Sequence, residues 1–175
     1  MPATKMQWES WKVTRLGKRP FDEGKCKAIG LSDVSLDQAK EIFEAGRIKP
    51  AVVHVESHPC LPQWHLLDYC RKNGIVLQAF AALGHSSEPR LLEDPVITAI
   101  AKRVNKTPAQ VLLAWAIQRG TALLTTSKTP SRIKENFGVS TLPEEAMREF
   151  SEGIKLRVRF NTVVETGVPG FIPRG

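Results

Sequence analysis

Phosphate-binding chemistry is suggested by Ser127, Lys128 and Arg132, which lie together in the stretch LLTTSKTPSRIKEN, residues 123–136. Residues 123–126 are apolar or β-branched and predict a buried strand, and Thr129-Pro130 predicts a helix that starts with an N-cap and a proline. The first backbone N–H groups of a helix attract anions, and a hydroxyl, an ammonium and a guanidinium beside them would strengthen that attraction. The stretch therefore predicts a phosphate pocket, and an ordinary strand–helix corner with solvated charges stays open as the alternative.

Composition predicts one globular domain. The 175 residues are 42% hydrophobic and 25% charged, which is enough apolar material to bury a core. The net charge of +7 favours anionic partners, but the basic residues are scattered among 18 acidic ones and form no continuous run. We therefore expect no dedicated role in nucleic-acid binding.

The cysteines and the hydropathy pattern predict a cytoplasmic location. Cys26, Cys60 and Cys70 are odd in number and lack metal-site spacing, which favours free thiols in a reducing compartment. No apolar stretch approaches the roughly 20 residues that span a bilayer, and the N-terminus lacks an apolar signal core. We expect no membrane partner.

Four apolar runs alternate with helical patterns along the chain. This alternation predicts an α/β fold with a parallel sheet. The expected strands are residues 26–32, 51–56, 75–80 and 123–126, and the expected helices are residues 36–45, 63–73, 92–104, 107–119, 130–136 and 142–154. Residues 1–21 predict an irregular or broken helix, residues 22–154 the folded unit, and residues 155–175 an extended tail.

Ligands of parallel α/β proteins bind at the carboxyl ends of the strands. Ser32, Asp33, His54, Phe80 and the turn 126–128 all lie at or near predicted strand ends. We therefore expect them on one rim, which favours the phosphate pocket over the ordinary corner.

Several of these motifs resemble the aldo-keto reductase family. KAIGLSDVS, residues 27–35, resembles the family segment KAIGVSNFS, and residues 52–84 resemble its NQVECHPYLPQ strand and turn followed by its AYSPLG strand. TPAQVLLAWAIQRG, residues 107–120, and TSKTPSRIKENF, residues 126–137, resemble the last barrel helix and the cofactor phosphate motif. These motifs follow the family's order and spacing over roughly residues 22–161.

The resemblance implies the C-terminal half of a (β/α)8 TIM barrel, with four strands similar to the family's fifth to eighth. The family reduces aldehydes or ketones with NADPH through an Asp, Tyr, Lys and His tetrad on the other half of its barrel. No catalytic residue is therefore expected here, and the only tyrosine, Tyr69, lies in the middle of a predicted helix. We expect a cofactor-binding half that is inactive or nearly so alone; the alternative is a non-catalytic half-barrel that binds a dinucleotide or acts as an interaction module.

A half-barrel leaves one sheet face and two edges open, which predicts a homodimer, association with an N-terminal half, or aggregation. Completed in the second way, the protein would bind NADPH and a small carbonyl substrate.

The resemblance also implies the residues that bind the cofactor. These are Ser32, Asp33, His54, Phe80, Ala81, Leu83, His85, Thr126, Ser127, Lys128, Thr129, Arg132, Glu135 and Asn136. Arg132 favours NADP over NAD because its planar guanidinium suits the 2′-phosphate, and Glu135 and Asn136 would hold the adenine. No metal site is expected.

Five of these positions depart from the family pattern. Asp33 replaces an asparagine, His54 a glutamine, Phe80 a tyrosine and Ala81 a serine. Thr126 replaces a lysine, which Lys128 would partly compensate. Outside the predicted site, His58 is interpreted as a structural turn residue, His65 as a solvated one, and Trp64 and Trp115 as core residues.

Overall fold

The sheet has four parallel strands in the order β1-β2-β3-β4, as predicted. The computed structural model describes residues 20–85 and 88–161. The strands are β1 Gly30–Ser32, β2 Val52–Glu56, β3 Val76–Phe80 and β4 Ala122–Leu123. In register, Ser32 lies opposite His54, His54 opposite Gln78, and Gln78 opposite Ala122. Consecutive strands are therefore neighbours, as in one arc of a barrel.

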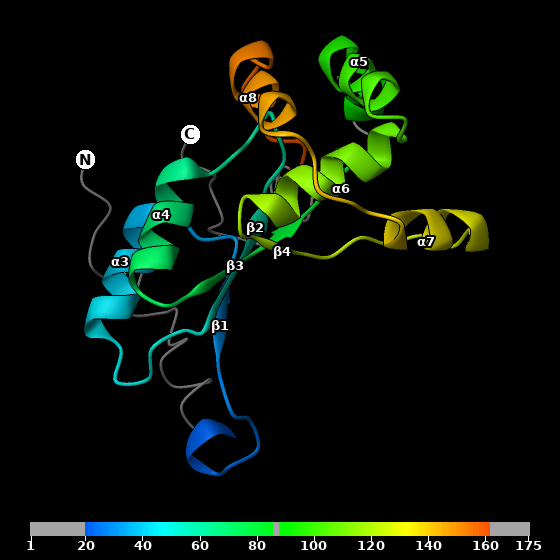
Figure 1. The fold of residues 1–175 in the computed structure, drawn as a ribbon. Coiled ribbons are helices and arrows are strands. Elements are labelled where there is room, and N and C mark those ends of the chain that lie inside the picture. The colour runs from blue at the N-terminus through cyan, green and yellow to red at the C-terminus, as the bar shows by residue number, and fades with distance from the viewer. Residues whose placement is uncertain (1–19, 86–87, 162–175) are drawn as a thin grey trace.

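Helices connect the strands and flank the sheet (Figure 1). They are α3 Leu36–Ala45, α4 Trp64–Lys72, α5 Pro95–Arg103, α6 Pro108–Gln118, α7 Pro130–Phe137 and α8 Glu144–Gly153, with a 3-10 turn, η1, at Leu91–Glu93. Ser35 and Thr107 form capping boxes at the starts of α3 and α6, and Asp94 caps α5 through the N–H groups of Val96 and Ile97. Figure 1 shows α7 projecting away from the sheet.

The core consists of two apolar clusters. Val53, Val55 and Leu77 of the sheet belong to the first cluster, with Leu67 and Cys70 of α4. The second cluster joins α5, α6 and α8 through residues that include Ile97, Ile100, Val111, Leu112 and Phe150. Because strand side chains alternate, His54, Gln78 and Phe80 project from the sheet face opposite the first cluster.

Two strand predictions were too long. The strand predicted over residues 26–32 begins only at Gly30, and this short strand, β1, pairs with β2 on one side. The predicted buried strand 123–126 was wrong beyond Leu123: Leu124 still donates its N–H to the Ala79 carbonyl at 3.0 Å, but its side chain is 56% exposed. Thr125 and Thr126 are exposed too, because among the described residues no strand lies beyond β4 to cover them.

Trp64 was predicted in the core and is 41% exposed, whereas Trp115 is buried. Residues 1–19 of the predicted broken helix and residues 162–175 of the predicted tail lie outside the described residues. The division of the chain at residues 21 and 154 stays a prediction. In the described part of the chain, no helix is both long and apolar enough to cross a membrane.

Candidate functional site

The carboxyl ends of β1, β2 and β3 bring together four of the predicted site residues. Ser32 ends β1, and Asp33 follows in a left-handed conformation (φ 52°), with its N–H donating to the His54 carbonyl at 2.9 Å. The His54 and Phe80 rings lie 5.0 Å apart between centroids. The rim therefore offers an aromatic face beside a carboxyl and an imidazole.

Two polar groups on this rim have unusual environments. Burial raises the pKa of Asp33, and the opposing effects of Arg159 and His54 do not cancel that rise. The Nδ1 atom of His54 is buried without a hydrogen-bond partner among the described residues. A buried polar atom left in this state is costly, so a ligand that hydrogen-bonds to it would be favoured.

The residues of the predicted phosphate pocket lie at the start of α7. Thr129 is the N-cap and Pro130 the first helical residue, but the Thr129 side chain does not cap the helix; instead Ser127 Oγ accepts the Thr129 N–H at 3.2 Å. Lys128 and Arg132 are exposed, and neither forms an ion pair with a described residue. Uncapped N–H groups therefore lie close in sequence to two cations that have no carboxylate partner.

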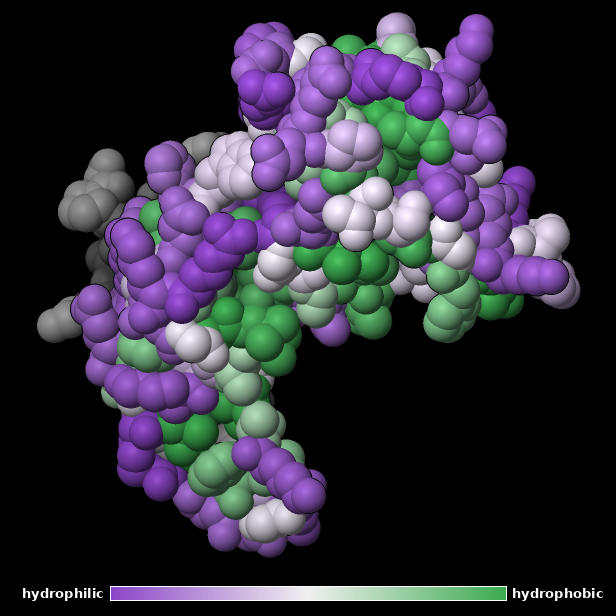
Figure 2. All heavy atoms as spheres, in the orientation of Figure 1, coloured by the Kyte–Doolittle hydropathy of each residue, from purple (hydrophilic) through white to green (hydrophobic). Residues whose placement is uncertain are grey.

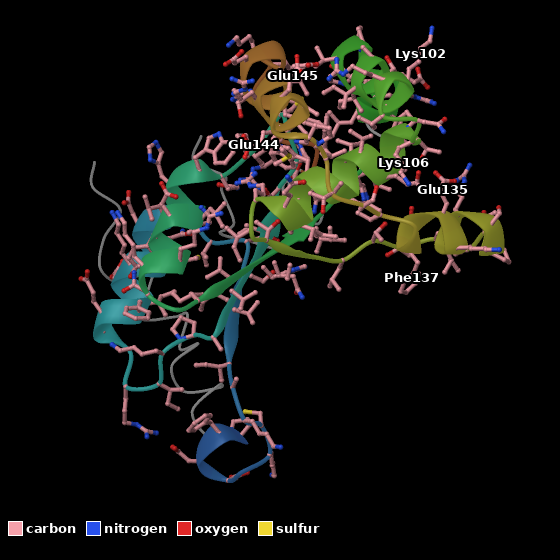
Figure 3. All side chains as sticks on the ribbon, in the orientation of Figure 1. Lys102, Lys106, Glu135, Phe137, Glu144 and Glu145 are labelled. Carbon is pink, nitrogen blue, oxygen red and sulfur yellow. The ribbon has the colours of Figure 1, made fainter. Side chains whose placement is uncertain are left out.

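Glu135 has a partner within the chain. Its Oε1 accepts a hydrogen bond from Thr107 Oγ1 at 2.5 Å, and Gln110 Nε2 donates to its backbone carbonyl at 3.1 Å. Figure 3 shows Glu135 and Phe137 on opposite sides of α7. These bonds tie α7 to the start of α6, and the adenine role expected of Glu135 stays a prediction.

Three further predicted residues, Ala81, Leu83 and His85, lie in the turn after β3, whereas Thr126 lies between β4 and α7 and Asn136 lies within α7. Ala81 and His85 both have left-handed backbones (φ 52°), and Gly84 donates its N–H to the Ala81 carbonyl at 2.8 Å. The Leu83 side chain packs against the cluster of α5, α6 and α8. The predicted residues thus form a group at the ends of β1–β3 with the turn that follows, and a second group at the start of α7.

Comparisons with known proteins decide the family. The model of the aldo/keto reductase family matches residues 18–154. This chain belongs to the aldo/keto reductase family. It is 37% identical over 147 residues to the aldehyde reductase YPR1 of Saccharomyces cerevisiae, covering 83% of this chain and 47% of that one. It is 39% identical over 140 residues to the glycerol 2-dehydrogenase (NADP(+)) of the same yeast, covering 79% and 45%.

Solved aldo-keto reductases match the fold as well. The enzyme MGS-M4 from a deep-sea metagenome library superposes with a TM-score of 0.78 at 34% identity, covering 90% of this chain and 60% of that chain. The aldose reductase of Schistosoma japonicum gives a TM-score of 0.78 at 35% identity, covering 95% and 53%. The four parallel strands and their helices therefore match part of the aldo-keto reductase barrel, and the chain spans about half the length of these curated relatives.

A buried carboxylate at the carboxyl end of β2 was missed in the sequence analysis. Glu56 is fully buried, and its Oε1 lies 2.9 Å from His58 Nε2 and accepts the Phe160 N–H at 2.6 Å. Its Oε2 accepts the Asn161 N–H at 2.9 Å and lies 3.8 Å from Arg159 Nη1. Residues 155–161, here called the strap, are thus anchored to β2, and Val158 also donates its N–H to the carbonyl of Cys60, in the turn after β2, at 3.1 Å.

The charge of Glu56 is held by its hydrogen bonds. Burial alone would raise the pKa of Glu56, but His58 and the N–H groups of Phe160 and Asn161 together hold it below its usual value. His58 is itself fully buried and its ring lies 4.6 Å from the Phe160 ring, in keeping with the structural role expected for it. The one signal in the sequence was a carboxylate inside the apolar run AVVHVE.

Arg119 was also missed. Its guanidinium is buried between the rings of Trp64 and Trp115, 4.2 and 4.4 Å from their centroids, and donates to the Pro62 carbonyl. Burial and the nearby Arg71 lower the pKa of Arg119 to about 10. The Arg119 guanidinium covers one face of the Trp64 ring, which is otherwise exposed at the surface. The spacing of apolar residues in the sequence did not indicate this contact.

Proposed function

We propose that this chain is the cofactor-binding half of an aldo-keto reductase that reduces aldehydes or ketones with NADPH, and that it is inactive or nearly so alone. The observation that carries the proposal is the start of α7, where no side chain caps the helix. Lys128 and Arg132 lie close to this helix end in sequence, and neither has a carboxylate partner among the described residues. In a family member, this arrangement suits the 2′-phosphate of NADP.

The rim supplies the complementary part of a dinucleotide site. A bound NADPH would supply a hydride to the carbonyl carbon of the substrate. The Phe80 ring offers a face for the nicotinamide, and the unpartnered Nδ1 of His54 can hydrogen-bond to its carboxamide. An ionised Asp33 accepts from the carboxamide nitrogen but donates nothing, which weakens this end of the site.

The proposed inactivity rests on the lack of the family's tetrad: no tyrosine lies at the rim among the described residues. Tyr69, the single tyrosine of the sequence, lies in α4, and its ring packs edge-on against Phe43 of α3 with centroids 6.1 Å apart. Burial raises the pKa of its hydroxyl. These helices lie on the face of the sheet opposite His54 and Phe80. Cys26, Cys60 and Cys70 are free thiols, so we also propose a cytoplasmic location.

Equilibrium titration of the full chain with NADPH and with NADH tests the proposal. We expect saturable binding that favours NADPH, and Arg132→Ala should weaken NADPH binding about tenfold or more because it removes charge-assisted hydrogen bonds to a phosphate. Arg148→Ala, which removes an exposed arginine of α8, is the matched control and should bind normally. A folded chain that binds neither nucleotide would overturn the proposal and favour the interaction module.

A further inference from the structure

Both edges of the sheet are open in the part of the chain that the structure describes. Among the described strands, β1 pairs with β2 alone and β4 pairs with β3 alone. Unpaired N–H and C=O groups at an edge readily pair with another chain. Figure 2 shows hydrophobic residues along the concave margin of the molecule.

The sheet face opposite α3 and α4 is suited to burial. Val76 is 48% exposed and Leu124, just beyond β4, is 56% exposed. Gln78 on the same face carries no charge, and Glu56 is already held by His58 and the strap. Two such faces could therefore meet without repulsion between like charges, despite the net charge of +7.

The helix beyond β4 also lacks a partner on one side. No residue of α7 is buried, and Ile133 and Phe137 are 42% and 87% exposed. They lie four positions apart and so share one side of the helix. Figure 3 shows Phe137 pointing away from α6. In the chain, α7 follows β4 and the turn after it, and it projects away from the sheet (Figure 1).

The helix at the opposite edge carries complementary charge. Asp37, Glu41 and Glu44 of α3 are all exposed, follow helical spacing, and form no ion pair with a described residue. On α7, Arg132 and Lys134 are exposed, while the carboxylate of Glu135 is bonded to Thr107. An acidic helix thus follows β1 and a basic helix follows β4.

From these features we propose that two copies of the 175-residue chain associate about a twofold axis. In this dimer β4 of each copy pairs in parallel with β1 of the other, closing an eight-stranded barrel and consuming all four open edges. The crossover rule places the helix after β4 toward the next strand, so α7 of one copy would lie beside α3 of its partner, basic against acidic. The proposal rests on the open surfaces; because Arg132 also belongs to the proposed cofactor site, the dimer is tested without nucleotide and with variants outside that site.

Sedimentation of the full chain tests this dimer. We expect a species of twice the 19.5 kDa of one chain, with a dissociation constant that rises with salt. Ile133→Lys with Phe137→Lys, and separately Val76→Lys, should each give the 19.5 kDa monomer, because they place charge on the two parts of the interface. Circular dichroism should be unchanged, since these side chains are exposed.

Ile117→Lys is the matched control, because Ile117 is 51% exposed on α6 and lies on neither open edge. It should leave the dimer intact. A wild-type chain that stays monomeric at every concentration would overturn the proposal. So would an open-ended polymer, or a barrel that closes only with a different polypeptide. If Val76→Lys still formed the dimer, the sheet face opposite α3 and α4 would not be buried in it, and the proposal would be excluded.

Discussion

The Glu56 carboxylate accepts the backbone N–H of Phe160 at 2.6 Å, which joins the second strand of the sheet to a residue 104 positions later in the chain. The link is made by a fully buried charge that also contacts His58. Because a buried carboxylate without its donors is costly, the strap and the sheet depend on each other.

Removing the charge of Glu56 should destabilise the fold. In Glu56→Gln the amide nitrogen would face a backbone N–H that now bonds to a carboxylate oxygen, so we expect a loss of roughly 2–4 kcal/mol in the free energy of unfolding. Urea unfolding measures this loss. Glu152→Gln, at an exposed glutamate of α8, is the control and should stay within about 0.5 kcal/mol of the wild type. An unchanged midpoint for Glu56→Gln would contradict the prediction.

The same carboxylate should make stability depend on pH. The pKa of Glu56 is lower in the folded chain than its usual value of 4.5, so its contribution is complete above that value and is lost as pH falls through the folded-state pKa. Asp33, whose pKa is raised by burial, acts in the opposite sense. Urea midpoints measured from about pH 7 to about pH 3 should therefore fall more steeply in the wild type than in Glu56→Gln. If the midpoints of the two proteins changed with pH in parallel, the pKa of Glu56 would be the same in the folded and unfolded chains, contrary to the prediction.

Restoring the family residue at position 33 should strengthen cofactor binding. An asparagine both donates and accepts, so Asp33→Asn would complete the pair of hydrogen bonds to a carboxamide and remove a carboxylate that burial disfavours. We expect NADPH to bind several-fold to about tenfold more tightly, measured by the titration described above. Asp37→Asn, at an exposed aspartate of α3, is matched in charge and should have no effect. Equal affinities for the wild type and Asp33→Asn would place the nicotinamide away from this residue.

The two apolar clusters should unfold as one unit. Leu67 and Leu112 belong to different clusters and are both almost fully buried, so Leu67→Ala and Leu112→Ala should each cost about 2–5 kcal/mol. Because the strap and α6 join the two parts, each variant should shift one transition seen by both circular dichroism and tryptophan fluorescence. Two separate transitions, each moved by one variant alone, would show independent units.

Much of this fold follows from local sequence. The alternation of apolar runs with capped helices predicted the four parallel strands, and Thr107-Pro108 and Thr129-Pro130 marked two helix starts correctly. The same local pattern overextended the last strand, because the exposure of Leu124 depends on what lies beside β4 and not on the residue type.

The candidate site was predictable to a similar extent. Ser32, Asp33, His54 and Phe80 lie together at the rim because parallel strands end on one side of the sheet. Glu56 was not predicted because its partners, Phe160 and Asn161, belong to the backbone of a distant segment, and a backbone N–H leaves no trace in residue type. Arg119 was missed for the related reason that its partners are two ring faces and the Pro62 carbonyl.

The strap also orders the events of synthesis. Strands β1 to β4 and their helices are complete by residue 153, but the carboxylate of Glu56 obtains its last donor only when Asn161 has left the ribosome. A nascent chain paused before the strap leaves the Glu56 carboxylate with His58 alone, without the N–H groups of Phe160 and Asn161. Completion of the fold therefore waits for the synthesis of the strap.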